Sequence, residues 1–258
     1  GTFPSGRPVC GREYVRMTMQ TIDANKMESV ALNAALRAAG TREIRIGHCV
    51  GQRYIGTGLS DCLLEIDGTP GNALGAYLNG GVIRVRGNVQ EATGDTMNGG
   101  EIVVDGSAGD ATGYAMRGGK IFVRGDVGYR CGIHIKAYRE NRPAIVIGGR
   151  AGSFLGEYQA GGVIIVLGLH EDGRPIVGNF CGTGMHGGEI FFRGSELPAR
   201  LPAQVRAEEI GALPDEAEAL VREWCSLFER DPAPLLRTPY IRLTPDSGNP
   251  YRQLYVGN

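Results

Sequence analysis

Aliphatic residues alternate with other residues in seven short segments, and these segments recur about every nineteen residues along the chain. Alternation with a period of two is typical of a β-strand with one buried face. A helix does not explain it, because residues i and i+2 do not share a helical face. Each segment therefore predicts one strand with two inward side chains. The first inward position holds Leu64, Ile83, Ile102, Ile121, Ile145, Ile164 and Ile190, and the second holds Ile66, Val85, Val104, Val123, Ile147, Val166 and Phe192.

Glycines recur with the same period, so each strand belongs to a longer repeating unit. One series is Gly68, Gly87, Gly106 and Gly125, and another is Gly56, Gly75, Gly94, Gly113, Gly132, Gly156 and Gly182. Glycine is favoured where the chain turns with positive φ, so these positions predict the corners between strands. Strands that share one orientation and stack at about 4.8 Å form a parallel β-helix, a solenoid of about seven coils. Small residues such as Ala73, Ala92 and Ala111 are expected to point into its narrow interior.

The outward positions of these strands change character along the repeat. The early strands carry charges that are expected to alternate in sign between neighbours: Arg84 and Arg86, then Glu101 and Asp105, then Lys120 and Arg124. The later strands carry an apolar outer strip of Ala144, Val146, Val163, Ile165 and Leu167. A row of exposed aliphatic side chains would be an aggregation hazard. We therefore expect the C-terminal helix to cover this strip, the alternative being an interface with another copy or with a catalytic subunit.

Both flanks of the repeat lack its period. Residues 13–46 predict strand, helix and strand, with Asn25 and Glu28 as a capping box and Gly40 as the helix stop. Residues 196–214 predict a connector on the outside, residues 215–230 an amphipathic helix, and the last stretch an extended, loop-like tail. The N-terminal unit and the C-terminal helix are the expected end caps. The predicted organisation is an N-terminal cap (1–46), a β-helix (47–194) and a C-terminal connector, helix and tail (195–258).

Composition narrows the functional classes. Glycine makes up 42 of 258 residues, the hydrophobic content is 42%, and the net charge is −1. A globular chain of this charge gives no electrostatic reason to expect nucleic acid or an anionic membrane surface. We find no apolar run of about 18 residues and no signal-peptide pattern, and we expect a cytoplasmic protein.

Cysteines and histidines are scattered. Cys10, Cys49, Cys62, Cys131, Cys181 and Cys225 form no CxxC pair, so small buried thiols are expected. The histidines fall in different units, and no metal site is predicted. No catalytic, cofactor-binding or metal-binding residue is predicted on this chain.

One insertion, residues 133–143, is denser in chemistry than the rest of the repeat. It carries His134, Lys136, Tyr138, Arg139, Glu140 and Arg142. Insertions in solenoids tend to lie on one face and contact partners, so an interface loop and a solvated loop are both open. An independent enzyme that works at His134 and Lys136 is the weakest hypothesis.

Three segments carry a family resemblance: "GQRYIGTGL", "MRGGKIFVRGDVGYRCGIHIK" and "GNFCGTGMHGGEIFFRG". They resemble the GXGXG domain at the C-terminus of the glutamate synthase large subunit, over residues 14–194 and most specifically over 47–194. The same domain occurs in one component of formylmethanofuran dehydrogenase, the one designated C, and in a related formyltransferase/hydrolase complex. The resemblance implies a right-handed β-helix that braces catalytic domains and does not hold the reacting groups.

The resemblance also implies partners. Glutamate synthase moves ammonia from glutamine to 2-oxoglutarate with FMN and an iron–sulfur cluster. We therefore expect a noncatalytic subunit of a glutamate-synthase-like complex, with an amidotransferase (glutaminase) subunit and an FMN synthase subunit that bear those cofactors. Self-association stays open. The alternative is a subunit similar to that component of formylmethanofuran dehydrogenase, whose partners handle formyl groups. The residues from 195 onward lie outside the shared motif.

Overall fold

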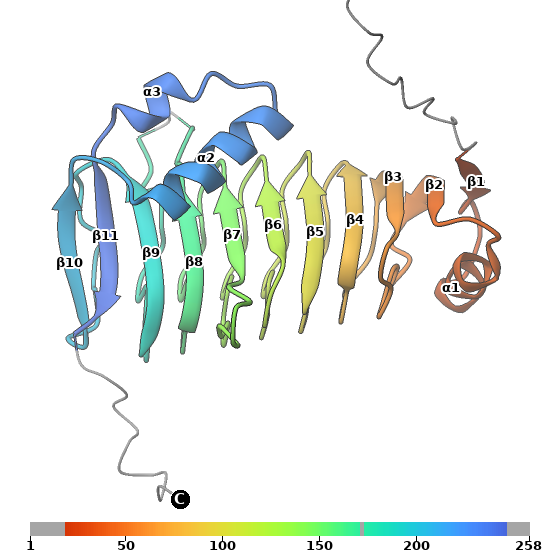
Figure 1. Ribbon diagram of the computed structural model, residues 1–258, viewed down its shortest axis with the longest axis horizontal. Helices are drawn as coiled ribbons and strands as arrows, with labels where there is room; N and C mark the ends of the chain where they lie inside the picture. Colours follow the sequence, from red (N-terminus) through yellow and green to blue (C-terminus); the bar gives the residue numbers. More distant parts are fainter. Residues whose placement is uncertain (1–18, 171–172, 247–258) are drawn as a thin grey trace, which may run out of the picture.

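One β-sheet organises the described part of the chain, residues 19–170 and 173–246 of the computed structural model (Figure 1). Its spatial order is β1 to β9 in sequence order, followed by β11 and then β10. The strands are β1 (Gln20–Asp23), β2 (Glu43–Val50), β3 (Leu63–Thr69), β4 (Asn79–Arg86), β5 (Gly99–Val104), β6 (Lys120–Val123), β7 (Ala144–Ile147), β8 (Ala160–Val166), β9 (Gly187–Arg193), β10 (Val205–Ile210) and β11 (Tyr240–Pro245). The helices are α1 (Ser29–Ala38), α2 (Asp215–Leu227) and α3 (Ala233–Leu236).

The two predicted ladders of inward side chains are confirmed. Neighbouring strands from β1 to β9 pair in parallel, and Leu64, Ile83, Ile102, Ile121, Ile145, Ile164 and Ile190 occupy successive partner positions. All these side chains and those of the second ladder are buried. The ladders are longer than the sequence pattern predicted. Ile44 and Ile46 of β2 extend them at one end, and Leu243 and Ile241 of β11 extend them at the other.

The turns between strands stack as regularly as the strands. Gly75 has a φ of +64°, and a Cβ there would lie 2.7 Å from Cδ1 of Ile102, so only glycine fits this corner without strain. Backbone hydrogen bonds also join successive turns, for example from the Gly94 amide to the Leu74 carbonyl at 2.8 Å. A further line of parallel bridges runs through Val89, Ala108, Val127, Ala151 and Val177.

The predicted inward placement of Ala73, Ala92 and Ala111 agrees with the burial of Ala73 but not with the partial exposure of the other two. These residues occupy the turns with φ of 62°, 55° and 53°. Ala73 is buried and Ala92 and Ala111 are partly buried, while the residue after each one is fully buried: Leu74, Thr93 and Thr112.

The predicted charge pattern on the early strands is only partly correct. Glu101 lies opposite Lys120 as expected, but Arg84 lies between Glu65 and Val103 in register. Lys120 forms its ion pair with Glu223 of α2, with 2.6 Å between Nζ and Oε2. The helix supplies a carboxylate that the repeat alone could not reveal.

The C-terminal segment covers the apolar outer strip, as predicted. Helix α2 crosses the sheet over β7 and β8 (Figure 1) and packs Leu220, Val221 and Trp224 against Val146, Val163 and their neighbours. The Trp224 indole N–H donates to the Val123 carbonyl oxygen at 2.9 Å. These buried contacts tie the segment to the flank of the stack.

Two expectations for the C-terminal segment are wrong. The connector 196–214 contains the strand β10, and residues 240–245 of the expected loop-like tail form β11. Strand β11 pairs antiparallel with both β9 and β10. These two strands therefore close this end of the sheet, and α2 covers the flank. Residues 247–258 of the tail lie outside the described residues.

The N-terminal flank forms the expected strand, helix and strand, with β1 parallel to β2 and α1 beside them at the end of the stack (Figure 1). The capping box is wrong: Glu28 is the N-cap without a side-chain hydrogen bond, and the Asn25 amide donates to Asp23 Oδ1 at 3.0 Å. Buried Gln52 instead fastens this flank to the first turn, through hydrogen bonds from Nε2 to the carbonyls of Ala24 and Met27, both 3.0 Å. Among the described residues, no helix is long and apolar enough to cross a membrane.

Candidate functional site

The insertion 133–143 divides into two parts that face different surroundings. Tyr138 and Asn141 exchange backbone hydrogen bonds of 3.0 Å, which folds the middle of the insertion into a tight hairpin. Arg142 leaves toward α2 and lies 3.0 Å from the Glu216 carboxylate. His134, in contrast, lies among aromatic rings on the turns. The insertion does not gather its charged side chains into one cluster.

His134 and Lys136 are both exposed and have different neighbours. The His134 ring stacks on Tyr158 with 5.0 Å between centroids and 11° between planes, and Tyr114 meets it edge-on at 6.0 Å. No ion pair with Lys136 is formed within the described chain. The contacts of His134 are those of a packing surface and supply no acid–base partner.

The cysteines confirm the expectation of buried thiols wherever they are described. Cys49, Cys62, Cys131, Cys181 and Cys225 are buried and unpaired, while Cys10 lies outside the described residues. Burial raises the pKa of Cys49 to about 11 and that of Cys131 to about 12, and it raises the pKa of the other three thiols as well. These thiols stay protonated at neutral pH and behave as small hydrophobic groups.

The histidines serve local contacts. His48 lies 3.0 Å from Asp23, His170 lies 3.1 Å from Asp126, and His186 Nδ1 lies 3.1 Å from the Gly184 carbonyl. In the described ranges, no group of three or more His, Cys, Asp or Glu side chains could hold a metal ion.

Aromatic rings from the later units form two rows of exposed or half-buried side chains on the turns, which we together call the aromatic strip. It consists of Tyr114, Tyr129, His134, Phe154, Tyr158 and Phe180. One row of rings runs from Tyr114 through His134 to Tyr158. The other runs from Tyr129 to Phe154 at 5.3 Å and on to Phe180 at 5.2 Å. Tyr114, Tyr129 and Phe180 keep 38–39% of their surface exposed.

Arg130 lies beside the second row of rings. Its guanidinium is 4.9 Å from the centroid of Tyr129 and 5.7 Å from that of Phe154. Its Nε lies 2.9 Å from Oε2 of Glu157, whose side chain is almost fully buried. This ion pair and the two cation–π contacts fix the arginine among the rings. The sequence held a signal for these residues, because Arg130, Phe154 and Phe180 stand two positions before a repeat glycine.

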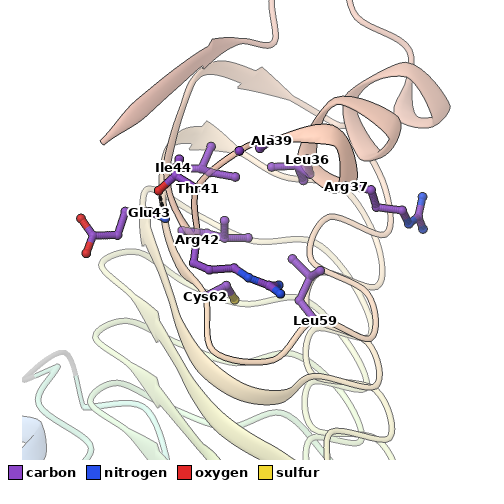
Figure 2. Close-up of a pocket in the computed structure, with 11 residues that line it drawn as sticks. Leu36, Arg37, Ala39, Thr41, Arg42, Glu43, Ile44, Leu59 and Cys62 are labelled. Atoms are coloured by element: carbon purple, nitrogen blue, oxygen red, sulfur yellow. Dashed lines mark hydrogen bonds between the residues drawn. The ribbon is translucent and has the colours of Figure 1, made fainter. Parts of the chain in front are cut away.

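A pocket of about 660 Å³ opens near the N-terminal end of the stack, where α1 replaces an ordinary turn (Figure 2). Its wall is apolar, with Leu36, Ile44 and Leu64 buried in it. Figure 2 shows the Arg42 side chain reaching between Cys62 and Leu59, while the Arg37 side chain points outward. Such a site offers apolar contacts, and two cations, Arg37 and Arg42, are among its lining residues.

Known proteins resemble this chain over most of its length. The model of the GXGXG motif family matches residues 12–234. An uncharacterized protein of Methanocaldococcus jannaschii, MJ1350, is 41% identical over 249 residues, which cover 91% of this chain and 95% of that protein. A solved chain from the formyltransferase/hydrolase complex FhcABCD of Methylorubrum extorquens, in complex with methylofuran, is 20% identical with a TM-score of 0.60. That match covers 88% of this chain and 91% of the solved one.

The stacked strands and glycine turns define a repeat protein dominated by parallel β-structure, with few helices. Within that class, the family match and the 41% identical relative identify the family. The chain belongs to the GXGXG motif family.

Proposed function

We propose that this chain is a scaffold subunit of a multi-subunit enzyme complex, built as a right-handed β-helix. One observation carries the proposal: the fold matches a chain of the FhcABCD complex over 88% of this chain and 91% of that one. Because both coverages are high, the likeness concerns a whole subunit and not a shared fragment. A stack of parallel units also suits this task, since it presents side chains at a fixed spacing along an extended surface.

Two kinds of complex are candidates. The likeness to a chain of a formyltransferase/hydrolase complex supports a subunit of a complex that handles formyl groups. The glutamate-synthase-like interpretation is supported only by the GXGXG family. We therefore place the formyl-group complex first and keep the glutamate-synthase-like complex as the second candidate.

Cofactors and organisation follow from the same proposal. In either complex, partner subunits bear the reacting groups, and FMN and an iron–sulfur cluster belong to partners in the glutamate-synthase-like case. The division into residues 1–46, 47–194 and 195–258 stays a prediction.

Purification of the tagged chain from its native cells tests the proposal. We expect stoichiometric co-purification of at least one further subunit. The purified complex is then assayed for formyl transfer from a formylated furan cofactor and for glutamine-dependent glutamate formation, and its absorbance is recorded for flavin. Formyl transfer supports the first candidate, and glutamate formation with bound flavin supports the second. A chain that purifies alone and carries out either reaction would refute the scaffold proposal.

A further inference from the structure

The aromatic strip combines exposure with an unfavourable backbone. His134, Phe154, Tyr158 and Phe180 have φ between 54° and 59°, a left-handed conformation that bulky residues rarely adopt. At the equivalent places the three units before these rings use mainly alanine (Ala73, Ala92, Ala111 and Ala115), with Thr96 as a further small residue, while Tyr54 and Tyr77 place rings in the same kind of turn nearer the N-terminus. The rings are not needed to fill the interior, because they lie on the outside of the turns. Strained residues that fill no core point to a functional surface.

The strip has the composition of a protein interface. Tyrosine, phenylalanine and arginine are enriched at the centres of protein–protein contacts, where large rings and a stacked guanidinium bury much surface at low entropic cost. Arg130 is held in place by Glu157 and by the rings of Tyr129 and Phe154. The ring stacking likewise fixes His134 and Tyr158 before any partner arrives. Such pre-organisation lowers the cost of binding.

The charges beside the strip indicate the chemistry of the partner. On the His134 side, Lys136 is exposed and without an ion pair in the described chain, and Arg117 donates only to backbone carbonyls, including that of His134 at 3.1 Å. Of the carboxylates nearby, Glu157 is buried and paired with Arg130, while Asp110 accepts the Tyr129 amide at 2.7 Å beside the other row of rings and keeps its negative charge. Lys136 and Arg117 therefore contribute positive charge on the His134 side of the strip.

We propose that the aromatic strip is the docking surface for a partner subunit of the complex, and that the docked segment presents apolar side chains bordered by aspartate or glutamate. This inference rests on the proposed function. It assigns the contact to the turns of the later units, whereas the apolar strip of the sheet is already covered by α2.

The chain offers a matched control for the test. Tyr54 and Tyr77 are exposed by 57% and 54% and have φ of 60° and 57°, yet they lie on earlier units, away from the strip. The double variant Phe154→Asn/Phe180→Asn removes two rings of the strip, and Tyr54→Asn/Tyr77→Asn removes two rings in the same kind of turn. Asparagine tolerates the left-handed backbone, so both double variants retain the turns.

The measurement is the dissociation constant between the purified chain and the co-purifying subunit identified from native cells, with thermal melting as a check on folding. We expect the strip variant to weaken binding by at least about 30-fold and the control by less than about threefold. Lys136→Glu should slow association and reduce its salt dependence. A photo-crosslinking residue at Tyr129 should label the partner, and one at Tyr77 should not.

The outcomes separate this inference from the proposed function. If the wild-type complex forms and the folded strip variant binds as well as the control, the strip is not the docking surface. If the wild-type chain forms a homodimer and the strip variant is monomeric, the occupant of the strip is a second copy and the inference is refuted. If the wild-type chain has no partner subunit, the proposed function fails and this inference fails with it.

Discussion

Removal of the Trp224 side chain should strongly destabilise the protein, because this residue joins α2 to the sheet. Trp224 is 1% exposed and packs with Phe228 and the apolar outer strip. Truncation of a buried tryptophan to alanine costs about 3–5 kcal/mol. For a chain of this size, that loss lowers the melting temperature by about 6–20 °C, at roughly 2–4 °C for each kcal/mol.

The indole hydrogen bond contributes a smaller share of this stability. Its acceptor, the Val123 carbonyl oxygen, also accepts the Gly148 amide at 2.8 Å, so removal of the indole N–H does not leave it unsatisfied. Trp224→Phe should therefore lose about 0.5–1.5 kcal/mol for the hydrogen bond, plus a packing loss well below that of alanine.

The assay is equilibrium unfolding in urea together with the binding of a dye that reports exposed apolar surface. Leu197→Ala is the control, because Leu197 is exposed and should change stability by less than about 0.5 kcal/mol. We expect Trp224→Ala to bind more dye and to self-associate as Val163 and Ile165 become accessible. A loss below about 1 kcal/mol with unchanged dye binding would show that α2 does not hold the flank of the stack.

Three further predictions concern the turns, one carboxylate and the thiols. Gly75→Ala should lower the free energy of unfolding by about 2–4 kcal/mol, because left-handed backbone strain adds to a clash with Ile102. Gly51 has a φ of +76° and open space around it, so Gly51→Ala should lower the free energy of unfolding by only about 1 kcal/mol in the same assay. The pKa of Glu101 is raised, first by burial and then by Glu223, so its folded state prefers the proton. Its contribution to stability is therefore present below the ordinary pKa of 4.5 and is lost as the pH rises through the folded pKa. In Glu101→Gln, the free energy of unfolding in urea should depend less on pH across that window. Ellman's reagent should label none of the five buried cysteines until the protein unfolds, and labelling of any one of them in the native protein would contradict their burial.

The repeat itself was predictable because its cause is local. Alternation at Ile102 and Val104 marks a strand, and the same pattern nineteen residues later marks its neighbour, so the sequence contains both the strand and its register. The pattern is lost at β2, where Ile44 and Ile46 join the same ladders but α1 replaces the glycine turn that marks a unit elsewhere. A search for the full repeat therefore misses the first members of the ladder.

The C-terminal strands were not predictable for a different reason. Strand β11 follows Pro239 and ends at Pro245, and its pairing with β9 joins residues about fifty positions apart in the sequence, so no local period reveals that pairing. The aromatic strip lies between these cases. Phe154 and Phe180 are 26 residues apart because an insertion lengthens the intervening unit, and they align only when positions are counted from the repeat glycines. Tyr129 stands three positions before its glycine and not two, so the repeat does not place it in line with them.

The stacking of each unit on only its two neighbours makes this molecule resemble a one-dimensional chain of coupled elements. Each strand from β2 to β8 pairs only with the strands on either side of it. A defect at one unit is therefore transmitted outward stepwise, and a broken unit in the middle would leave two shorter stacks, each with a new open edge. Helix α2 is the exception, because it packs across several units from the outside and couples their stability. The units covered by α2 should unfold together, while those nearer the N-terminus can unfold one after another.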